Sequence, residues 1–143
     1  MLTGEYSHSI DNKSRLIIPA KIREELGDKF AITKGLDGCL LMYPKDEWES
    51  FVMKLQSLPA SRKDTREIKR FYLGGAYETD FDKQGRIQLP ANLMKYAGIE
   101  NEAVFVGVGN HAEIWSSHKW QESSQFDNIE DLAEKISELG LNF

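Results

Sequence analysis

Hydrophobic and polar positions follow the same order twice along the chain. In the first copy, residues 5–10 alternate in character and predict a strand, residues 11–14 predict a tight turn, and residues 15–18 predict the return strand of a hairpin. The second copy repeats this order over residues 75–90, at an offset of 71 residues. The repetition predicts two copies of one structural module in a single chain.

Each predicted hairpin is followed by the pattern of a short helix. Pro19 and Pro90 end the return strands, and each can begin a helix because proline lacks the N–H that a strand donates and has a φ suited to the first helical position. Apolar residues on one side continue towards Gly27 and Gly98, where the helices are expected to end. A second hairpin follows in each copy, with predicted strands at residues 30–33 and 40–43, and at 103–108 and 113–115.

The pattern divides the chain into four parts. These are a first module (5–48), a helical linker (49–74) with predicted helices at 46–58 and 61–73, a second module (75–120), and an acidic tail (121–143) with a predicted helix at 128–139. A module of two short hairpins buries little core alone, so the two copies are expected to pack their sheets together around a pseudo-twofold axis. The predicted fold class is α+β.

Charge is unevenly distributed along the chain. The formal net charge is −5, and residues 113–143 contain seven acidic and two basic side chains. The rest of the chain is therefore balanced and can carry local basic surfaces. No apolar stretch reaches the roughly 18 residues that span a bilayer, and residues 1–5 lack the features of a signal peptide. Together with a single cysteine, Cys39, these features indicate a cytoplasmic protein without membrane contact.

Side chains that could support catalysis or hold a metal are scattered. His8, His111 and His118 lie far apart in the sequence, and none has a cysteine or carboxylate at metal-ligand spacing. Cys39 is expected to be a small buried residue rather than a nucleophile. We therefore expect no enzyme activity, no metal or other cofactor, and no small-molecule substrate. A pocket in which histidine or cysteine side chains converge would revive the enzyme alternative.

The turns of the two first hairpins carry basic side chains. Each has an aspartate four residues before an arginine with one lysine between them, at Asp11, Lys13 and Arg15 and at Asp82, Lys83 and Arg86. A two-stranded ribbon fits the major groove of DNA, where arginine reads guanine and a neighbouring lysine contacts phosphate. The alternative is that the Asp–Arg pairs only stabilise the turns. Repetition favours the DNA contact, although a duplicated stabilising turn would repeat as well.

A third basic cluster lies in the linker, at Arg62, Lys63, Arg66, Lys69 and Arg70. We interpret it as a solvated face, or as a surface that meets an acidic surface of a neighbouring subunit, in preference to a direct DNA contact. Its natural acidic partner is the C-terminal tail. The aromatic side chains of Trp48, Trp115 and Trp120 are expected in the core or in an interface rather than stacked on bases.

The duplicated Asp-x-x-x-Arg motif, followed each time by an apolar strand and Pro-Ala, resembles the signature of the MraZ family over nearly the whole chain. The resemblance implies an AbrB-like swapped-hairpin barrel and a homo-oligomeric ring. It further implies a nucleoid-associated transcription regulator, with repression as the expected effect, that binds direct repeats upstream of its own division and cell-wall gene cluster.

The resemblance also implies roles for single residues. The DNA-facing residues would be Lys13, Arg15, Lys83 and Arg86, and Asp11 and Asp82 would hold the turns rigid. Gly85 can take the positive φ that restores strand pairing, whereas the first copy has Ser14 at that position. The rival hypothesis is a protein-interaction module, antitoxin-like or an assembly hub, that docks through its acidic C-terminal helix.

Overall fold

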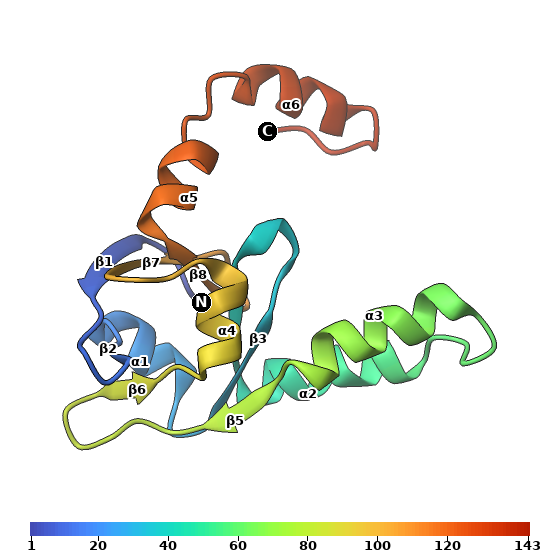
Figure 1. Cartoon of the computed structure of the whole chain (residues 1–143). Helices are drawn as coiled ribbons and strands as arrows, with labels where there is room; N and C mark the ends of the chain where they lie inside the picture. Colours follow the sequence, from blue (N-terminus) through green and yellow to red (C-terminus); the bar gives the residue numbers. More distant parts are fainter.

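The structure is a computed structural model that describes residues 1–143, and its fold is α+β, as predicted. Figure 1 shows a strand-rich body from which two helical elements extend. The strands are β1 (Glu5–Ser9), β2 (Arg15–Ile17), β3 (Phe30–Lys34), β4 (Leu40–Pro44), β5 (Tyr77–Thr79), β6 (Arg86–Gln88), β7 (Glu102–Gly107) and β8 (Ala112–Ser116). The helices are α1 (Ala20–Leu26), α2 (Lys45–Gln56), α3 (Lys63–Gly74), α4 (Ala91–Ala97), α5 (Ser117–Ser123) and α6 (Ile129–Ser137).

The main sheet combines strands of both copies. Its order is β1-β7-β8-β4-β3-β5, and every neighbouring pair is antiparallel. If the two copies are exchanged, β1 maps onto β5, β7 onto β3 and β8 onto β4, so the order maps onto itself. The equivalent residues Leu41 and Glu113 face each other in the central β4–β8 pair. The topology therefore has the twofold relation that the sequence repeat predicts.

The predicted first hairpins are wrong in their pairing. The bridge Ile10↔Leu16 is the one β-bridge that joins the first strand to its own return strand. Instead, β1 pairs with β7 and β5 pairs with β3, while β2 and β6 form a separate two-stranded ribbon. A local hairpin would leave each copy with its own small core, whereas exchange lets both copies fill one core. The second hairpins, β3–β4 and β7–β8, form as predicted.

The pairings do not close the sheet into the barrel that the family resemblance implied. In the six-stranded sheet, β1 and β5 are the two edges and are not paired with each other. The ribbon β2–β6 lies outside this sheet as a second, shorter layer.

Alternation along the strands divides the apolar side chains between two cores. In β4, Leu40 and Met42 belong to the larger core of 18 buried residues, and Leu41 and Tyr43 belong to a smaller one on the other face of the sheet. The larger core includes the inward residues of the ribbon and of α1 and α4. Burial of each large aliphatic side chain contributes about 1.5–3 kcal/mol. Both faces of the central strands are therefore covered, and the ribbon is fixed to the body by its inner face.

The helices begin and end close to the predicted residues. Helices α1 and α4 start one residue after Pro19 and Pro90 and end before Gly27 and Gly98, which have the positive φ that glycine allows. Helices α2 and α3 form a hairpin that extends from the body, and α6 stands apart above α5 (Figure 1). None of the helices combines the length and the apolar character of a membrane span.

Candidate nucleic-acid interface

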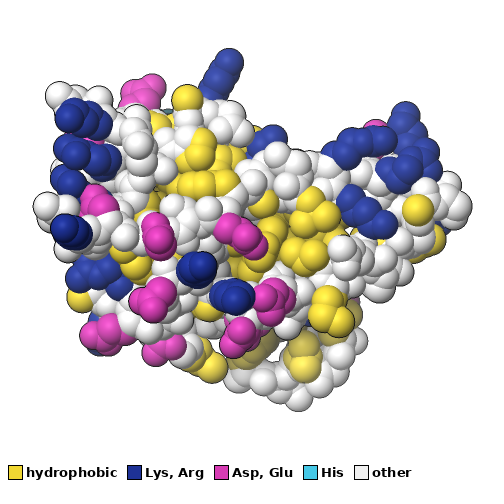
Figure 2. All heavy atoms as spheres, turned by 90° about the horizontal axis from the view of Figure 1, so that it is seen from below, with side chains coloured by type: hydrophobic (Ala, Val, Ile, Leu, Met, Phe, Trp, Pro, Cys, Tyr) yellow, Lys and Arg dark blue, Asp and Glu magenta, His cyan; other side chains and the backbone are white.

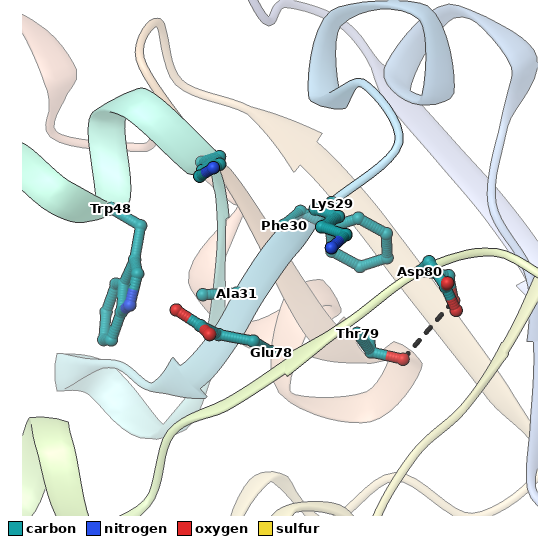
Figure 3. A pocket seen from close by; sticks show the side chains of 8 residues that line it. Lys29, Phe30, Ala31, Trp48, Glu78, Thr79 and Asp80 are labelled. Atoms are coloured by element: carbon teal, nitrogen blue, oxygen red, sulfur yellow. Dashed lines mark hydrogen bonds between the residues drawn. The ribbon is translucent and has the colours of Figure 1, made fainter.

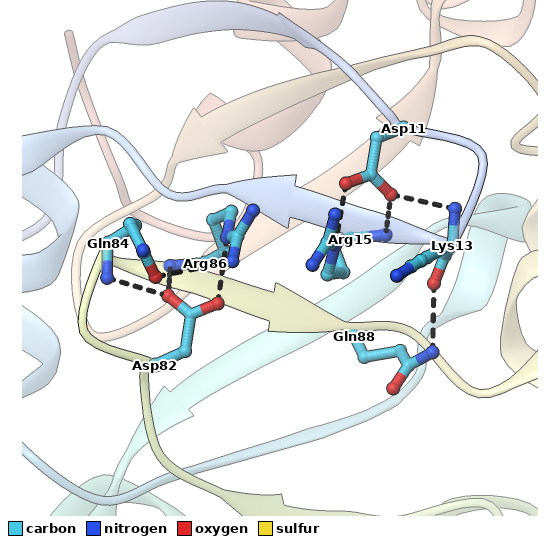
Figure 4. A network of polar contacts seen from close by, with 7 residues as sticks. All are labelled: Asp11, Lys13, Arg15, Asp82, Gln84, Arg86 and Gln88. Atoms are coloured by element: carbon cyan, nitrogen blue, oxygen red, sulfur yellow. Dashed lines mark hydrogen bonds and ion pairs between the residues drawn. The ribbon is translucent and has the colours of Figure 1, made fainter.

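The two Asp-x-x-x-Arg turns have the same hydrogen-bond geometry. In the first, Asp11 Oδ1 accepts the backbone N–H groups of Lys13 and Arg15, each at 2.9 Å, and Asp11 Oδ2 accepts Arg15 Nε–H at 2.7 Å. In the second, Asp82 Oδ1 accepts the backbone N–H groups of Gln84 and Arg86, each at 2.9 Å, and Asp82 Oδ2 accepts Arg86 Nε–H at 2.8 Å. Figure 4 shows both turns. Both turns also have a residue with positive φ before the arginine, Ser14 at 60° and Gly85 at 74°.

These contacts stabilise the ionised form of both aspartates. The backbone N–H of Arg15 is the largest cause that lowers the pKa of Asp11, and its side chain adds to the effect. The backbone N–H and the side chain of Arg86 lower the pKa of Asp82 in the same order of importance. Carboxylates that accept several N–H groups ionise more easily because the charged form makes the stronger hydrogen bonds.

Each turn is joined to the strand of the other copy. Ile18 N–H donates to the Gly85 carbonyl and Leu89 N–H donates to the Ser14 carbonyl, both at 3.0 Å. The ribbon between them has the equivalent residues Leu16 and Ile87 at its centre, facing each other and buried. The two turns therefore lie at opposite ends of one ribbon whose inner face is anchored in the larger core (Figure 4).

Both arginines lie on the outer face of this ribbon. Strand alternation directs Arg15 and Arg86 away from the core, and their side chains are 31% and 24% exposed. The Asp–Arg pair that the sequence allowed as an alternative does form in both turns. It uses only Nε, so the Nη groups of Arg15 make no hydrogen bond within the chain, and Arg86 donates through Nη2 to Gln84 Oε1 at 3.2 Å. The pairs orient the guanidinium groups and leave part of each at the surface.

Lys13 and Lys83 are exposed but do not occupy equivalent positions. At the offset of 71 residues, Lys13 corresponds to Gln84 and Lys83 corresponds to Asn12. Each turn therefore presents one ammonium group, placed differently relative to its arginine. Both could contact phosphate, because a lysine on a flexible stem needs no fixed geometry to do so.

This surface includes three residues that the sequence analysis did not select as candidates. Ile17 and Gln88 share the outer face with the two arginines, and the Gln88 amide donates to the Lys13 carbonyl at 2.8 Å. Period-two alternation from Arg15 and Arg86 could have identified both. Arg23 approaches Gly85 closely and donates to the Ile18 carbonyl at 2.8 Å, a tertiary contact that no local pattern indicates.

The basic cluster of the linker lies at the end of the α2–α3 hairpin. Figure 2 shows lysine and arginine side chains gathered there and, separately, on the opposite side of the molecule. Several of these bases are occupied locally: Arg62 pairs with Asp64 at 2.7 Å, Arg66 donates to the Ala60 carbonyl, and Lys69 donates to the Leu58 carbonyl. This cluster is not continuous with the ribbon.

The structure does not bring the candidate catalytic residues together. Cys39 is buried as predicted, and burial raises the pKa of its thiol to about 12, so the thiolate is not formed at neutral pH. His111 stacks on Tyr43, with burial lowering its pKa, and His118 lies beside Glu122 at 3.2 Å. No group of three or more histidine, cysteine or acidic side chains is placed to hold a metal ion. Trp48 and Trp115 are buried in the smaller core, and Trp120 packs against it.

A hollow of about 350 Å³ lies beside β3 and β5, shown in Figure 3. Its lining combines Lys29 and Lys45 with Glu78 and Asp80, and the wall includes Trp48. It contains neither histidine nor cysteine, so it adds no residue to the catalytic candidates considered from the sequence.

The fold and the ribbon define a class: a duplicated α+β protein whose two modules exchange strands and present paired Asp–Arg turns on one surface. A family model described as "MraZ protein, putative antitoxin-like" matches the chain twice, over residues 1–71 and 72–142. "Transcriptional regulator MraZ" of Clostridium tetani is 51% identical over 142 residues, covering 99% of this chain and 100% of the relative. The protein of the same name from Lachnoclostridium phytofermentans is 48% identical over 143 residues, covering 100% of both. The chain belongs to the MraZ family.

Proposed function

We propose that this chain is a sequence-specific DNA-binding transcription regulator that contacts DNA through the outer face of the β2–β6 ribbon. The observation that carries the proposal is the arrangement of Arg15 and Arg86 on one exposed face, each held by its aspartate through Nε. The names of the relatives, "Transcriptional regulator MraZ", support the regulatory role.

The geometry suits the major groove. A two-stranded ribbon is narrow enough to enter it, and arginine pairs there with guanine O6 and N7. Because Asp11 and Asp82 fix the Nε side of each guanidinium, less side-chain entropy is lost when the remaining N–H groups bind. Lys13 and Lys83 then contact phosphates on either side and set the register.

We propose as its target direct repeats upstream of its own division and cell-wall gene cluster, where occupation of the promoter represses transcription. In this proposal the protein is associated with the nucleoid. The support is the membership of the MraZ family and the name "Transcriptional regulator MraZ" that the relatives carry.

The test is a gel-shift titration with a duplex that contains a single upstream repeat. Arg15→Ala and Arg86→Ala should each weaken specific binding about 5- to 150-fold, because one arginine–guanine pair contributes about 1–3 kcal/mol of discrimination. Lys54→Ala removes one exposed positive charge of α2 and is the matched control, expected to bind like the wild type. Binding should weaken steeply with salt, as phosphate contacts release counterions. Unchanged binding by both arginine variants would show that the β2–β6 ribbon is not the surface that recognises DNA.

We also propose the division into modules 5–48 and 75–120, joined by the linker 49–74 and followed by the tail 121–143, with hairpins exchanged between the modules in the AbrB-like manner. The pairing of β1 with β7 and of β5 with β3 supports the exchange.

Assembly into a homo-oligomeric ring is a further part of the proposal, with α6 docking on α3 of a second copy. The apolar side of α6, formed by Ile129, Leu132 and Ile136, is exposed, and the helix is rich in acidic side chains. Helix α3 carries the opposite charge, with Lys63 and Arg70 exposed. Charge complementarity and an uncovered apolar face therefore favour contact between copies.

Light scattering after size exclusion tests this assembly. Leu132→Glu with Ile136→Glu should reduce the molar mass towards that of a monomer, and Gln125→Glu, which adds one negative charge outside the apolar side, should not. A wild-type monomer at micromolar concentration would contradict assembly and would favour the protein-interaction alternative, in which α6 binds another protein.

A further inference from the structure

The outer face of the ribbon is symmetric in its arginines and asymmetric beside them. Exchange of the two copies relates Arg15 to Arg86 and position 17 to position 88. The register pairs Arg15 with Gln88 and Ile17 with Arg86, so all four side chains lie on one face around a local twofold axis between Leu16 and Ile87. Of the four side chains, only the two arginines are related by this axis. The other equivalent positions, 17 and 88, hold isoleucine and glutamine.

Ile17 and Gln88 present different chemistry to a partner. Ile17 is 44% exposed, although it lies between charged and polar residues, and it offers only methyl and methylene groups. The Gln88 amide is oriented by the Lys13 carbonyl and keeps one N–H and its carbonyl oxygen for further hydrogen bonds. Neither side chain contributes to the core, so their difference is not explained by packing.

These two chemistries match different base pairs in the major groove. An aliphatic side chain contacts the thymine methyl group, and glutamine pairs with adenine N6 and N7. Arg15 and Arg86, in contrast, would read the same base in the two halves of the DNA site. A symmetric ribbon placed on the dyad of a duplex would read a palindrome, because the symmetry of a site mirrors the symmetry of the protein.

We propose that Ile17 and Gln88 determine specificity and make the ribbon read a non-palindromic site, which fixes the orientation of the protein on DNA. The inference rests on the proposed DNA-binding function. Lys13 and Lys83 also lie at non-equivalent positions of their turns, so the surroundings of the arginines differ in charge as well as in the side chains at positions 17 and 88.

The experiment is selection of bound duplexes from a random pool by the full chain, with two variants that restore symmetry. Gln88→Ile places isoleucine in both halves, and Ile17→Gln places glutamine in both. The wild type should select a consensus with matching base pairs opposite the arginines and different ones beside them. Each variant should select a palindromic consensus built from one wild-type half, and prefer it to the wild-type site about 5- to 150-fold.

Orientation is measured directly with a DNA-cleaving reagent tethered at Asn12→Cys, because Cys39 is buried and stays unmodified. The wild-type background should cleave on one side of the selected site, and the Gln88→Ile background on both sides. Circular dichroism confirms that the variants are folded, and both substituted side chains lie outside the core.

The outcomes separate the two proposals. A palindromic wild-type consensus, or folded variants that keep the wild-type asymmetry and one-sided cleavage, would overturn the assignment of Ile17 and Gln88 while leaving DNA binding intact. A pool that the wild type does not enrich at all would overturn the DNA-binding function itself, and this inference with it.

Discussion

The two turns at the ends of the ribbon have the same backbone conformation. They differ in the side chains that do not contribute to that conformation. Both have the aspartate that accepts three N–H groups and the residue with positive φ before the arginine. They differ in the two residues between, Asn-Lys against Lys-Gln, and in the residue with positive φ, Ser14 against Gly85. The turn conformation therefore requires the aspartate acceptor and a residue with positive φ. The side chains that differ between the two turns are the ones by which a ligand could distinguish them.

The surroundings of the two turns differ as well. Arg23 lies against Gly85 and donates to the Ile18 carbonyl. The residue equivalent to Arg23 is Met94, which packs against the larger core. The second turn therefore has an additional guanidinium beside it. Glycine takes the positive φ there without the strain that Ser14 has in the first turn, and it leaves the space that Arg23 occupies.

The largest expected effect concerns what the two turns share. Leu16→Ala and Ile87→Ala remove equivalent buried side chains beneath the ribbon, and each should lower the free energy of unfolding by about 2–5 kcal/mol. Because strands of both copies form one sheet, both variants should still unfold in a single transition. Urea titration followed by circular dichroism measures this, with the exposed Ile17→Ala expected within about 0.5 kcal/mol of the wild type. Two separate transitions would show that the copies fold independently.

The cross-copy pairing is also where prediction from the sequence failed. The strands, the turns, the helices up to Gly27 and Gly98, and the second hairpins all follow from local patterns, and the structure contains them. The partner of β1 does not follow, because its alternating pattern is satisfied equally by its own return strand or by β7. Residues 15–17 and 86–88 form strands too short for their sequence to specify register.

The site was predictable to a similar degree. The motif identified Asp11 and Asp82 as turn residues, and the structure shows them accepting the expected backbone N–H groups. The motif could not show whether the arginine side chains pair with the aspartates or stay available at the surface. In the structure, each arginine pairs through Nε and is also partly exposed. The charge pattern did not indicate Ile17, because an isolated isoleucine in a short strand carries no signal until the register places it on the same face as the arginines.

The second prediction separates conformational strain from lost space at the second turn. Gly85→Ala places a side chain in the left-handed region, which costs about 1–2 kcal/mol, and its Cβ also displaces the Arg23 guanidinium. Gly98→Ala is the matched control, since Gly98 has a similar φ of 68° and its Cβ would make only ordinary contacts with Lys119. Gly85→Ala should therefore be the more destabilising of the two in urea titrations. Equal losses would mean that Arg23 moves aside without cost.

The third prediction uses the aspartates that the turns share. Because both have a pKa below the usual value of about 3.9, their contribution to stability is fully present above that value and is lost as the pH falls through the lowered pKa. The double variant Asp11→Asn with Asp82→Asn should be less stable than the wild type at pH 7, and the difference should narrow below pH 4. Urea midpoints across this range measure it. The tail variant Asp127→Asn should run parallel to the wild type, and a constant gap for the double variant would contradict the role of ionisation.

The smallest expected effect is a gain at the first turn. Ser14 has a φ of 60°, a conformation that costs a non-glycine residue about 1–2 kcal/mol, and its hydroxyl makes no hydrogen bond that would offset this cost. Ser14→Gly relieves the strain but raises the conformational entropy of the unfolded chain. This increase lowers the free energy of unfolding by about 0.4–1 kcal/mol. A net stabilisation of about 0.5 kcal/mol should appear as a higher urea midpoint at an unchanged slope. Ser14→Ala keeps the strain and should leave the midpoint near that of the wild type. If Ser14→Gly instead destabilised the protein, the first turn would not share the left-handed geometry of the second, and the equivalence of the two turns would fail at its central residue.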